Sequence, residues 1–162
     1  MSTHAHAESP QGLNRLAFSA TVHCLTGCAI GEVLGMIIGT ALGWSNLATV
    51  ALAVGLAFFF GYLLTSLPLL RSGLALSAVV PLALASDTIS IAIMEVIDNT
   101  MMLLIPGVMD QHATDPGFYA ALSGSLLIAG TFAFPANRWL IGRGKGHAVV
   151  HERHGHGNPA HA

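Results

Sequence analysis

Long apolar stretches alternate with short polar segments along this chain, and the alternation predicts four helices that span a membrane. The apolar stretches cover about residues 17–42, 47–70, 73–105 and 118–137. A helix needs about 20 apolar residues to cross a bilayer, and the first, second and fourth stretches have that length. We therefore expect an all-α integral membrane protein built as a four-helix bundle.

The third apolar stretch is longer than one crossing requires, and it contains one proline and three acidic residues. These residues are Pro81, Asp87, Glu95 and Asp98. Two interpretations are open. The stretch forms either one long, kinked helix whose outer end leaves the bilayer or two half-helices that meet at a break near Asp87.

The composition supports a membrane protein and excludes several functions. Hydrophobic residues make up 53% of the chain and charged residues only 9%, whereas soluble domains carry about 25% charged residues. The formal net charge is -2 and the sequence has no basic patch, so the expected surroundings are a lipid bilayer and nucleic acid is not a partner. Glycines inside a membrane helix do not form a phosphate-binding loop, and an enzyme is not the favoured interpretation.

The basic residues predict how the chain is oriented in the membrane. All of them fall on one side of a four-span arrangement: Arg15, Arg71, Arg138, Arg143, Lys145 and Arg153. The positive-inside rule then places both termini on the cytoplasmic side of a multi-pass membrane protein. Trp44, Tyr119 and Trp139 lie near the expected interfaces, where aromatic residues are enriched.

Two polar segments enclose the four-span domain of residues 15–143. Residues 1–14 contain two histidines, and residues 144–162 form a His-rich tail. Neither segment has enough apolar residues to fold alone. Short His-rich tracts can collect metal ions, although these tails can equally be solvated segments in which His is common.

Five glycines follow one another at intervals of four in the first apolar stretch: Gly27, Gly31, Gly35, Gly39 and Gly43. Residues four apart lie on one face of a helix. A file of glycines lets another membrane helix approach closely. The file therefore predicts a helix contact, and we expect a homo-oligomer or an association with other membrane subunits.

A second file of residues runs beside these glycines and carries the chemistry of the first span. It contains Cys24, Cys28 and Glu32, with His23 next to it. Two cysteines one turn apart on a regular helix do not offer the Cβ separation of a disulfide. Their thiols can converge on one soft ion such as Cu(I), and imidazole with thiolate also suits Zn(II). The alternative is that both cysteines are small packing residues.

The third stretch repeats this combination of acidic and sulfur-containing side chains. One narrow helix face carries Asp87, Met94, Asp98 and Met101, with Glu95 and Met102 on its flank. A charged Asp near the bilayer centre costs at least about 2.5–3.5 kcal/mol. Asp87 should therefore be protonated, paired, ion-bound or hydrated, and we expect Glu32 to share its site at a similar depth. The methionines can also be plain packing residues.

Three separated motifs resemble an uncharacterised bacterial membrane-protein family catalogued as domain of unknown function 4396. Residues 23–32 are similar to its signature, which reads His-Cys-x-x-Gly-Cys-x-x-Gly-Asp/Glu. Residues 87–95 and 135–141 resemble its second and third motifs. The resemblance covers about residues 20–147 and implies a small helical bundle with His23, Cys24, Cys28, Glu32, Asp87, Glu95 and Asn137 as its notable residues. It implies no activity, because the family has none assigned.

The leading hypothesis is a soft-metal binding or transport protein of the inner membrane, with copper as the first choice of metal. The candidate metal-site residues are His23, Cys24, Cys28, Glu32, Asp87, Met94, Glu95 and Asp98. One alternative is an intramembrane redox protein that exchanges electrons between its thiols and a quinone. Another is a structural subunit of a larger membrane complex.

Overall fold

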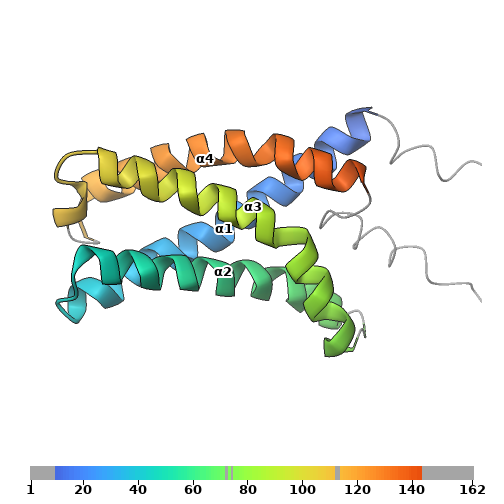
Figure 1. Ribbon diagram of the computed structural model, residues 1–162, viewed down its shortest axis with the longest axis horizontal. Coiled ribbons are helices and arrows are strands. Elements are labelled where there is room, and N and C mark those ends of the chain that lie inside the picture. Colours follow the sequence, from blue (N-terminus) through green and yellow to red (C-terminus); the bar gives the residue numbers. More distant parts are fainter. Residues whose placement is uncertain (1–9, 72, 74, 112–113, 144–162) are drawn as a thin grey trace, which may run out of the picture.

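The computed structural model describes residues 10–71, 73, 75–111 and 114–143, which form four long helices packed side by side (Figure 1). The elements in chain order are α1 (Pro10–Ala41), α2 (Asn46–Arg71), α3 (Leu76–Leu104), the short 3-10 helix η1 (Val108–Asp110) and α4 (Pro116–Gly142). The all-α prediction is confirmed. The first helix begins several residues earlier than the apolar pattern indicates, because the polar residues after Pro10 continue the helix.

The distribution of side chains is typical of a protein that faces lipid. Three helices, α1, α2 and α4, are long and apolar enough to cross a membrane, and α3 adds a fourth span when its two bent parts are taken together. Large apolar side chains cover the surface, for example Leu47, Val96 and Leu127, each more than two-thirds exposed. A bilayer is the solvent that stabilises such a surface.

Helix α1 and helix α2 approach so closely that backbone packs against backbone. A Cβ atom on Gly27 would lie 2.8 Å from the Cα atom of Gly61, and one on Gly31 would overlap the backbone of Ala57. Gly35 meets Ala53 in the same way. The predicted glycine groove is therefore present, and α2 of the same chain fills it. The groove is therefore used within the chain, and an oligomer stays a prediction that needs another contact surface.

Gly43 does not belong to this groove, although it continues the four-residue interval. It follows the end of α1 at Ala41 and has a φ of 64°, with nothing near the position of a Cβ atom. Glycine adopts this left-handed conformation without steric cost and commonly ends helices. Its role is to turn the chain from α1 into α2.

Helix α3 runs as one element from Leu76 to Leu104 but bends sharply next to Asp87, so that both of our interpretations stay open. Its parts Leu76–Ala85 and Asp87–Leu104 meet at an angle of 45°, and Figure 1 shows the first part leaning away from the rest of the bundle. Pro81 interrupts the backbone hydrogen bonds of the first part. At the bend, the Thr88 hydroxyl donates to the carbonyl oxygen of Leu84, and bonds of this kind often bend helices.

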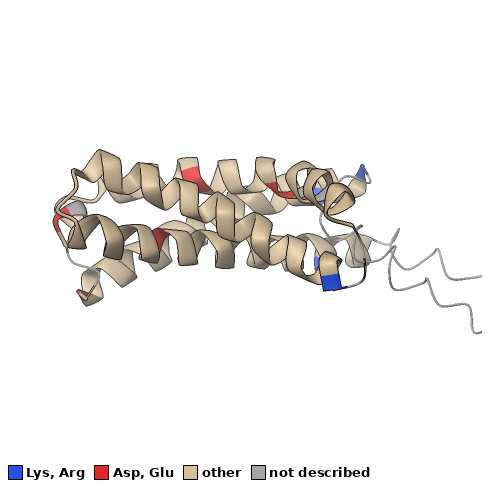
Figure 2. Ribbon diagram, turned by 90° about the horizontal axis from the view of Figure 1, so that it is seen from below, with Lys and Arg blue, Asp and Glu red and all other residues tan. Residues whose placement is uncertain are grey.

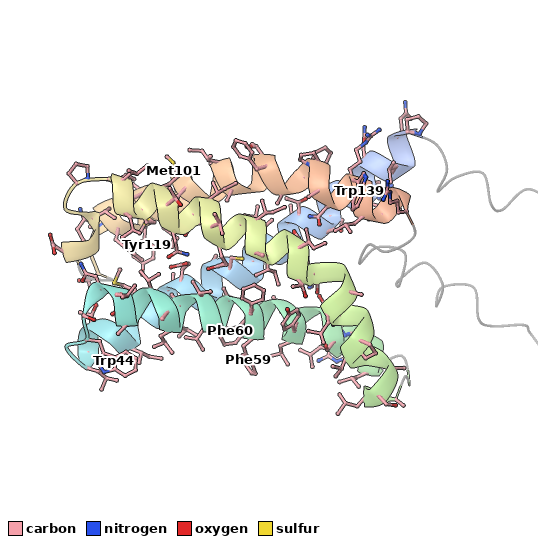
Figure 3. The ribbon with its side chains drawn as sticks, viewed as in Figure 1. Trp44, Phe59, Phe60, Met101, Tyr119 and Trp139 are labelled. Carbon is pink, nitrogen blue, oxygen red and sulfur yellow. The ribbon has the colours of Figure 1, made fainter. Side chains whose placement is uncertain are left out.

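The described arginines gather at one end of the bundle, which we call the arginine end (Figure 2). They are Arg15, Arg71, Arg138 and Arg143, while Lys145 and Arg153 lie outside the described residues. The start of α1 and the end of α4 meet here, where Arg138 Nε donates to Asn14 Oδ1 at 2.7 Å. Trp139 marks this end, whereas Trp44 and Tyr119 lie toward the opposite, loop end (Figure 3).

Candidate functional site

The interior of the bundle holds acidic side chains that the apolar surface hides. Asp98 is 0% exposed, Asp87 1%, Glu95 4% and Glu32 8%. Figure 2 shows acidic positions spread along the bundle, whereas the basic positions gather at one end. Charged groups in a low-dielectric interior are expensive unless they are paired, protonated or bound to an ion. This interior is therefore the place to look for function.

Two thiols and one thioether pack together in this interior, and we call Cys24, Cys28 and Met94 the sulfur cluster. All three side chains are at most 2% exposed and belong to one packed core group. Cys24 and Cys28 are free thiols one turn apart on α1, and Met94 comes from α3. The same core group contains Ala57 of α2, Ile91 of α3 and Ala129 of α4.

A hydrogen-bonded chain of side chains lies beside the sulfur cluster, on its arginine-end side. His23 Nε2 lies 3.3 Å from Thr65 Oγ1, and the Thr65 hydroxyl donates to Asp87 Oδ2. The Asp87 carboxyl group interacts electrostatically with the buried Cys24 thiol. The chain connects three helices, because His23 is on α1, Thr65 on α2 and Asp87 on α3.

On the loop-end side of the sulfur cluster, three carboxyl groups interact with one another. We call Glu32, Glu95 and Asp98 the acidic cluster. Asn99 Nδ2 donates to Glu32 Oε1 at 3.2 Å and to Glu95 Oε2 at 3.3 Å. Ser125 of α4 donates to Asp98 Oδ1, and Glu95 also lies next to the Cys28 thiol.

The structure changes the predicted pairing of the acidic residues. Glu32 faces Glu95 and Asp98, whereas Asp87 bonds to Thr65 and neighbours Cys24. The apolar stretch starts at residue 73, but α3 begins at Leu76 and bends next to Asp87. Both facts shift Asp87 toward the arginine end relative to Glu32.

The candidate metal ligands accordingly do not form one preformed site. In the described part of the chain, no three side chains of the His, Cys, Asp and Glu types are arranged to hold one ion. They divide instead into the sulfur cluster with Asp87 and His23 on one side and the acidic cluster on the other. Met102 packs in a different core group with Met36 and Phe118, and Met101 is only half-buried.

Two hydroxyl groups that bind the carboxylates were not identified from the sequence. Thr65 and Ser125 lie within the apolar stretches of α2 and α4, whereas the sequence pattern directed attention to α1 and α3. The only signal was that each is a polar residue within an apolar span. Asn137 has a structural place, because its Nδ2 donates to the buried Thr21 Oγ1 at 2.9 Å and joins α4 to α1.

These features define an all-helical protein of the membrane-spanning class with a polar interior. A family model described as "Domain of unknown function (DUF4396)" matches residues 14–146. The chain belongs to this family, as the resemblance predicted. No curated protein and no solved structure matches the chain.

Proposed function

We propose that this protein binds a soft transition-metal ion, with Cu(I) as the best fit, at the sulfur cluster inside the membrane. The observation that carries the proposal is the burial of two thiols and a thioether from two different helices in one packed group. Thiolate and thioether ligands select Cu(I) among biological metals. Two or three such ligands suffice for this ion, so the site needs no third His, Cys, Asp or Glu side chain.

The neighbours of the two thiols also support ion binding over plain packing. Each thiol interacts with a carboxyl group, Cys24 electrostatically with Asp87 and Cys28 at short range with Glu95. A cysteine kept only to fill space needs no acidic neighbour, and acidic residues inside a membrane are costly enough to indicate function. When both thiols bind Cu(I) as thiolates they release two protons, and these two carboxyl groups are the acceptors that lie next to them.

The protein functions, in this proposal, as a multi-pass carrier or receiver of the ion in a bacterial inner membrane. The arginines at one end of the bundle support cytoplasmic termini through the positive-inside rule. The sequence contains no ATP-binding motif, so transport is passive or coupled to another ion. A bundle of this size is small for a carrier, so copies of the chain or other membrane subunits complete the path.

Copper content after anaerobic purification tests the proposal. The full chain, loaded with Cu(I) and washed with a weak chelator, should retain one copper per chain. The variant with Cys24→Ser and Cys28→Ser should lose it and still insert and elute as the wild type does. A chain that lacks residues 147–162 controls for the His-rich tail and should keep its copper.

Two results would refute the assignment. One is copper retained by the double serine variant, and the other is copper lost only when the tail is removed. Failure of the wild-type protein to retain any soft metal would favour the redox or the structural-subunit hypothesis. Oxidation of the two thiols by a quinone analogue would then distinguish between these two hypotheses.

A further inference from the structure

An open apolar groove lies between α1 and α4 at the surface of the bundle. Its volume is about 720 Å³, and its walls include Val22, Thr26 and Ala29 of α1 with Ser123 and Leu127 of α4. Figure 1 shows α1 crossing the bundle from the end of α4 to the start of α2, so that α1 and α4 separate toward the loop end. The lining is almost entirely apolar, and the groove therefore suits a hydrocarbon chain.

Two arginines continue the helix faces that line this groove. Arg15 precedes Val22 by seven residues on α1, and Arg138 follows Leu127 by eleven residues on α4. These intervals are close to two and three whole turns of an α-helix, and residues separated by whole turns lie on one face. Both arginines are therefore in line with the groove, on the side of it that is nearer the arginine end.

One hydrogen bond fixes the second of these arginines at the seam between the two helices. Arg138 Nε donates to Asn14 Oδ1 at 2.7 Å, and Asn14 precedes Arg15 in the chain. Both arginines are exposed, and the bond occupies one of the five N–H groups of the Arg138 guanidinium. The start of α1 and the end of α4 thus present two guanidinium groups together at the surface.

No carboxyl group of the described residues neutralises this pair of arginines. The described acidic side chains are either buried inside the bundle, as Glu32, Asp87, Glu95 and Asp98 are, or belong to the loop end, as Asp110 and Asp115 do. Basic residues at a membrane surface attract anionic lipids by about 1 kcal/mol each. Arginine also binds phosphate groups through two parallel N–H bonds.

We propose that Arg15, Arg138 and the groove form a site, which we call the lipid site, for one anionic phospholipid of the bilayer. The lipid phosphate binds the two guanidinium groups, and an acyl chain fills the groove. Val22 lies about 10 Å from Arg15 along the axis of α1, and one leaflet provides about 15 Å of hydrocarbon. A chain that starts below Arg15 therefore extends past Val22 and into the groove.

The two parts of the lipid site select the class of ligand together. A bilayer offers hydrocarbon chains to every apolar surface, so the groove alone does not distinguish one phospholipid from another. The arginines make this distinction, because a zwitterionic head group brings a positive charge to them and an anionic head group does not. A soluble phosphate compound, in turn, leaves the groove unused.

Native mass spectrometry of the full chain in detergent tests the arginine part of the lipid site. The wild-type protein should retain one phosphatidylglycerol per chain and bind phosphatidylcholine with the same acyl chains at least tenfold more weakly. The variant with Arg15→Gln and Arg138→Gln should bind both lipids with the same, low affinity. Arg71→Gln, at an exposed arginine of α2 at the same end of the bundle, is the matched control and should leave the preference unchanged.

A second pair of variants tests the groove. Ala29→Phe places a ring in the groove and should weaken the binding of phosphatidylglycerol at least tenfold. Ala51→Phe, at an exposed position of α2, should not. An excess of glycerol phosphate, which has the head group without the chains, should fail to displace the lipid.

The inference is overturned if the wild type binds the two lipids equally or if the double arginine variant still prefers phosphatidylglycerol. A dimer that Ala29→Phe dissociates would assign the groove to a second copy of the chain and also overturn it. Should the variants fail to fold, the comparison of the two lipids on the wild type decides. The lipid site and the copper site can fail separately, because the variant with Cys24→Ser and Cys28→Ser should lose copper and still bind phosphatidylglycerol.

Discussion

Helix α1 has two faces that meet their neighbours in opposite ways. Toward α2 it presents Gly27, Gly31 and Gly35, and the two backbones touch without polar side chains between them. Toward α3 it presents Cys24, Cys28 and Glu32, which face a thioether and carboxyl groups. The glycine face allows α1 and α2 to pack closely. The second leaves buried groups without full compensation, which natural proteins tolerate mainly where function requires it.

The largest loss of stability is expected on the face of α1 that carries Gly27, Gly31 and Gly35. Gly31→Leu should destabilise the protein by at least about 3 kcal/mol, because the new side chain has to displace the backbone of Ala57. Thermal unfolding in detergent, followed by size-exclusion chromatography, measures the loss. Gly55→Leu on α2 is the matched control, since a Cβ atom there meets nothing, and it should be as stable as the wild type. Wild-type stability of Gly31→Leu would mean that the two helices do not touch at this point.

At the polar face, loss of a hydroxyl group should have the next largest effect on stability. Thr65→Val keeps the shape of the side chain but leaves Asp87 without its hydrogen-bond donor from α2. Removing one partner of a buried hydrogen bond costs about 1–3 kcal/mol. Thr100→Val, at an exposed position on α3, should cost far less. Equal thermal midpoints for the two variants would show that the Thr65–Asp87 bond contributes nothing.

Met94→Leu should separate metal binding from packing at the sulfur cluster. Exchange of Met for Leu conserves volume and costs less than about 1.5 kcal/mol in a core, so the fold should remain intact. Removal of a thioether ligand should weaken Cu(I) binding about tenfold, equivalent to about 1.4 kcal/mol. Met102→Leu, in the neighbouring core group, should leave copper affinity unchanged, and competition with a Cu(I) chelator measures both. Equal affinities would remove Met94 from the site.

The smallest loss of stability is expected at the surface of the arginine end. Arg138→Ala removes the bond to Asn14 between α4 and α1, and an exposed hydrogen bond of this kind contributes about 1 kcal/mol or less. A loss much larger than this in denaturant or thermal unfolding would mean that the two helix ends depend on this contact.

Features that depend on residues close in sequence could be predicted from the sequence, whereas those that depend on how helices align could not. The apolar stretches, the glycine groove and the bent third helix follow from local spacing. That α2 fills the groove, that Gly43 turns the chain, and that Glu32 meets Asp98 rather than Asp87 depend on helix register. Register is set by many contacts between distant segments, and a single sequence does not display these contacts.

The positions of isolated polar residues were unpredictable for the same reason. Ser125 bonds to Asp98 because α4 places it opposite α3, yet its own neighbours in the chain are ordinary small and apolar residues. The sequence predicted the part of the sulfur cluster that lies on α1, because Cys24 and Cys28 share one helix face. Its completion by Met94 required the structure, which brings the two helices together.

X-ray absorption spectroscopy of the Cu(I)-loaded full chain tests most directly whether the polar face of α1 binds the metal. The account predicts a spectrum with sulfur atoms as the nearest scatterers of copper in the wild type. It also predicts that this signal disappears in the variant with Cys24→Ser and Cys28→Ser. A first shell of nitrogen and oxygen scatterers that is the same in the wild type and in the double variant would place the copper elsewhere and contradict the account.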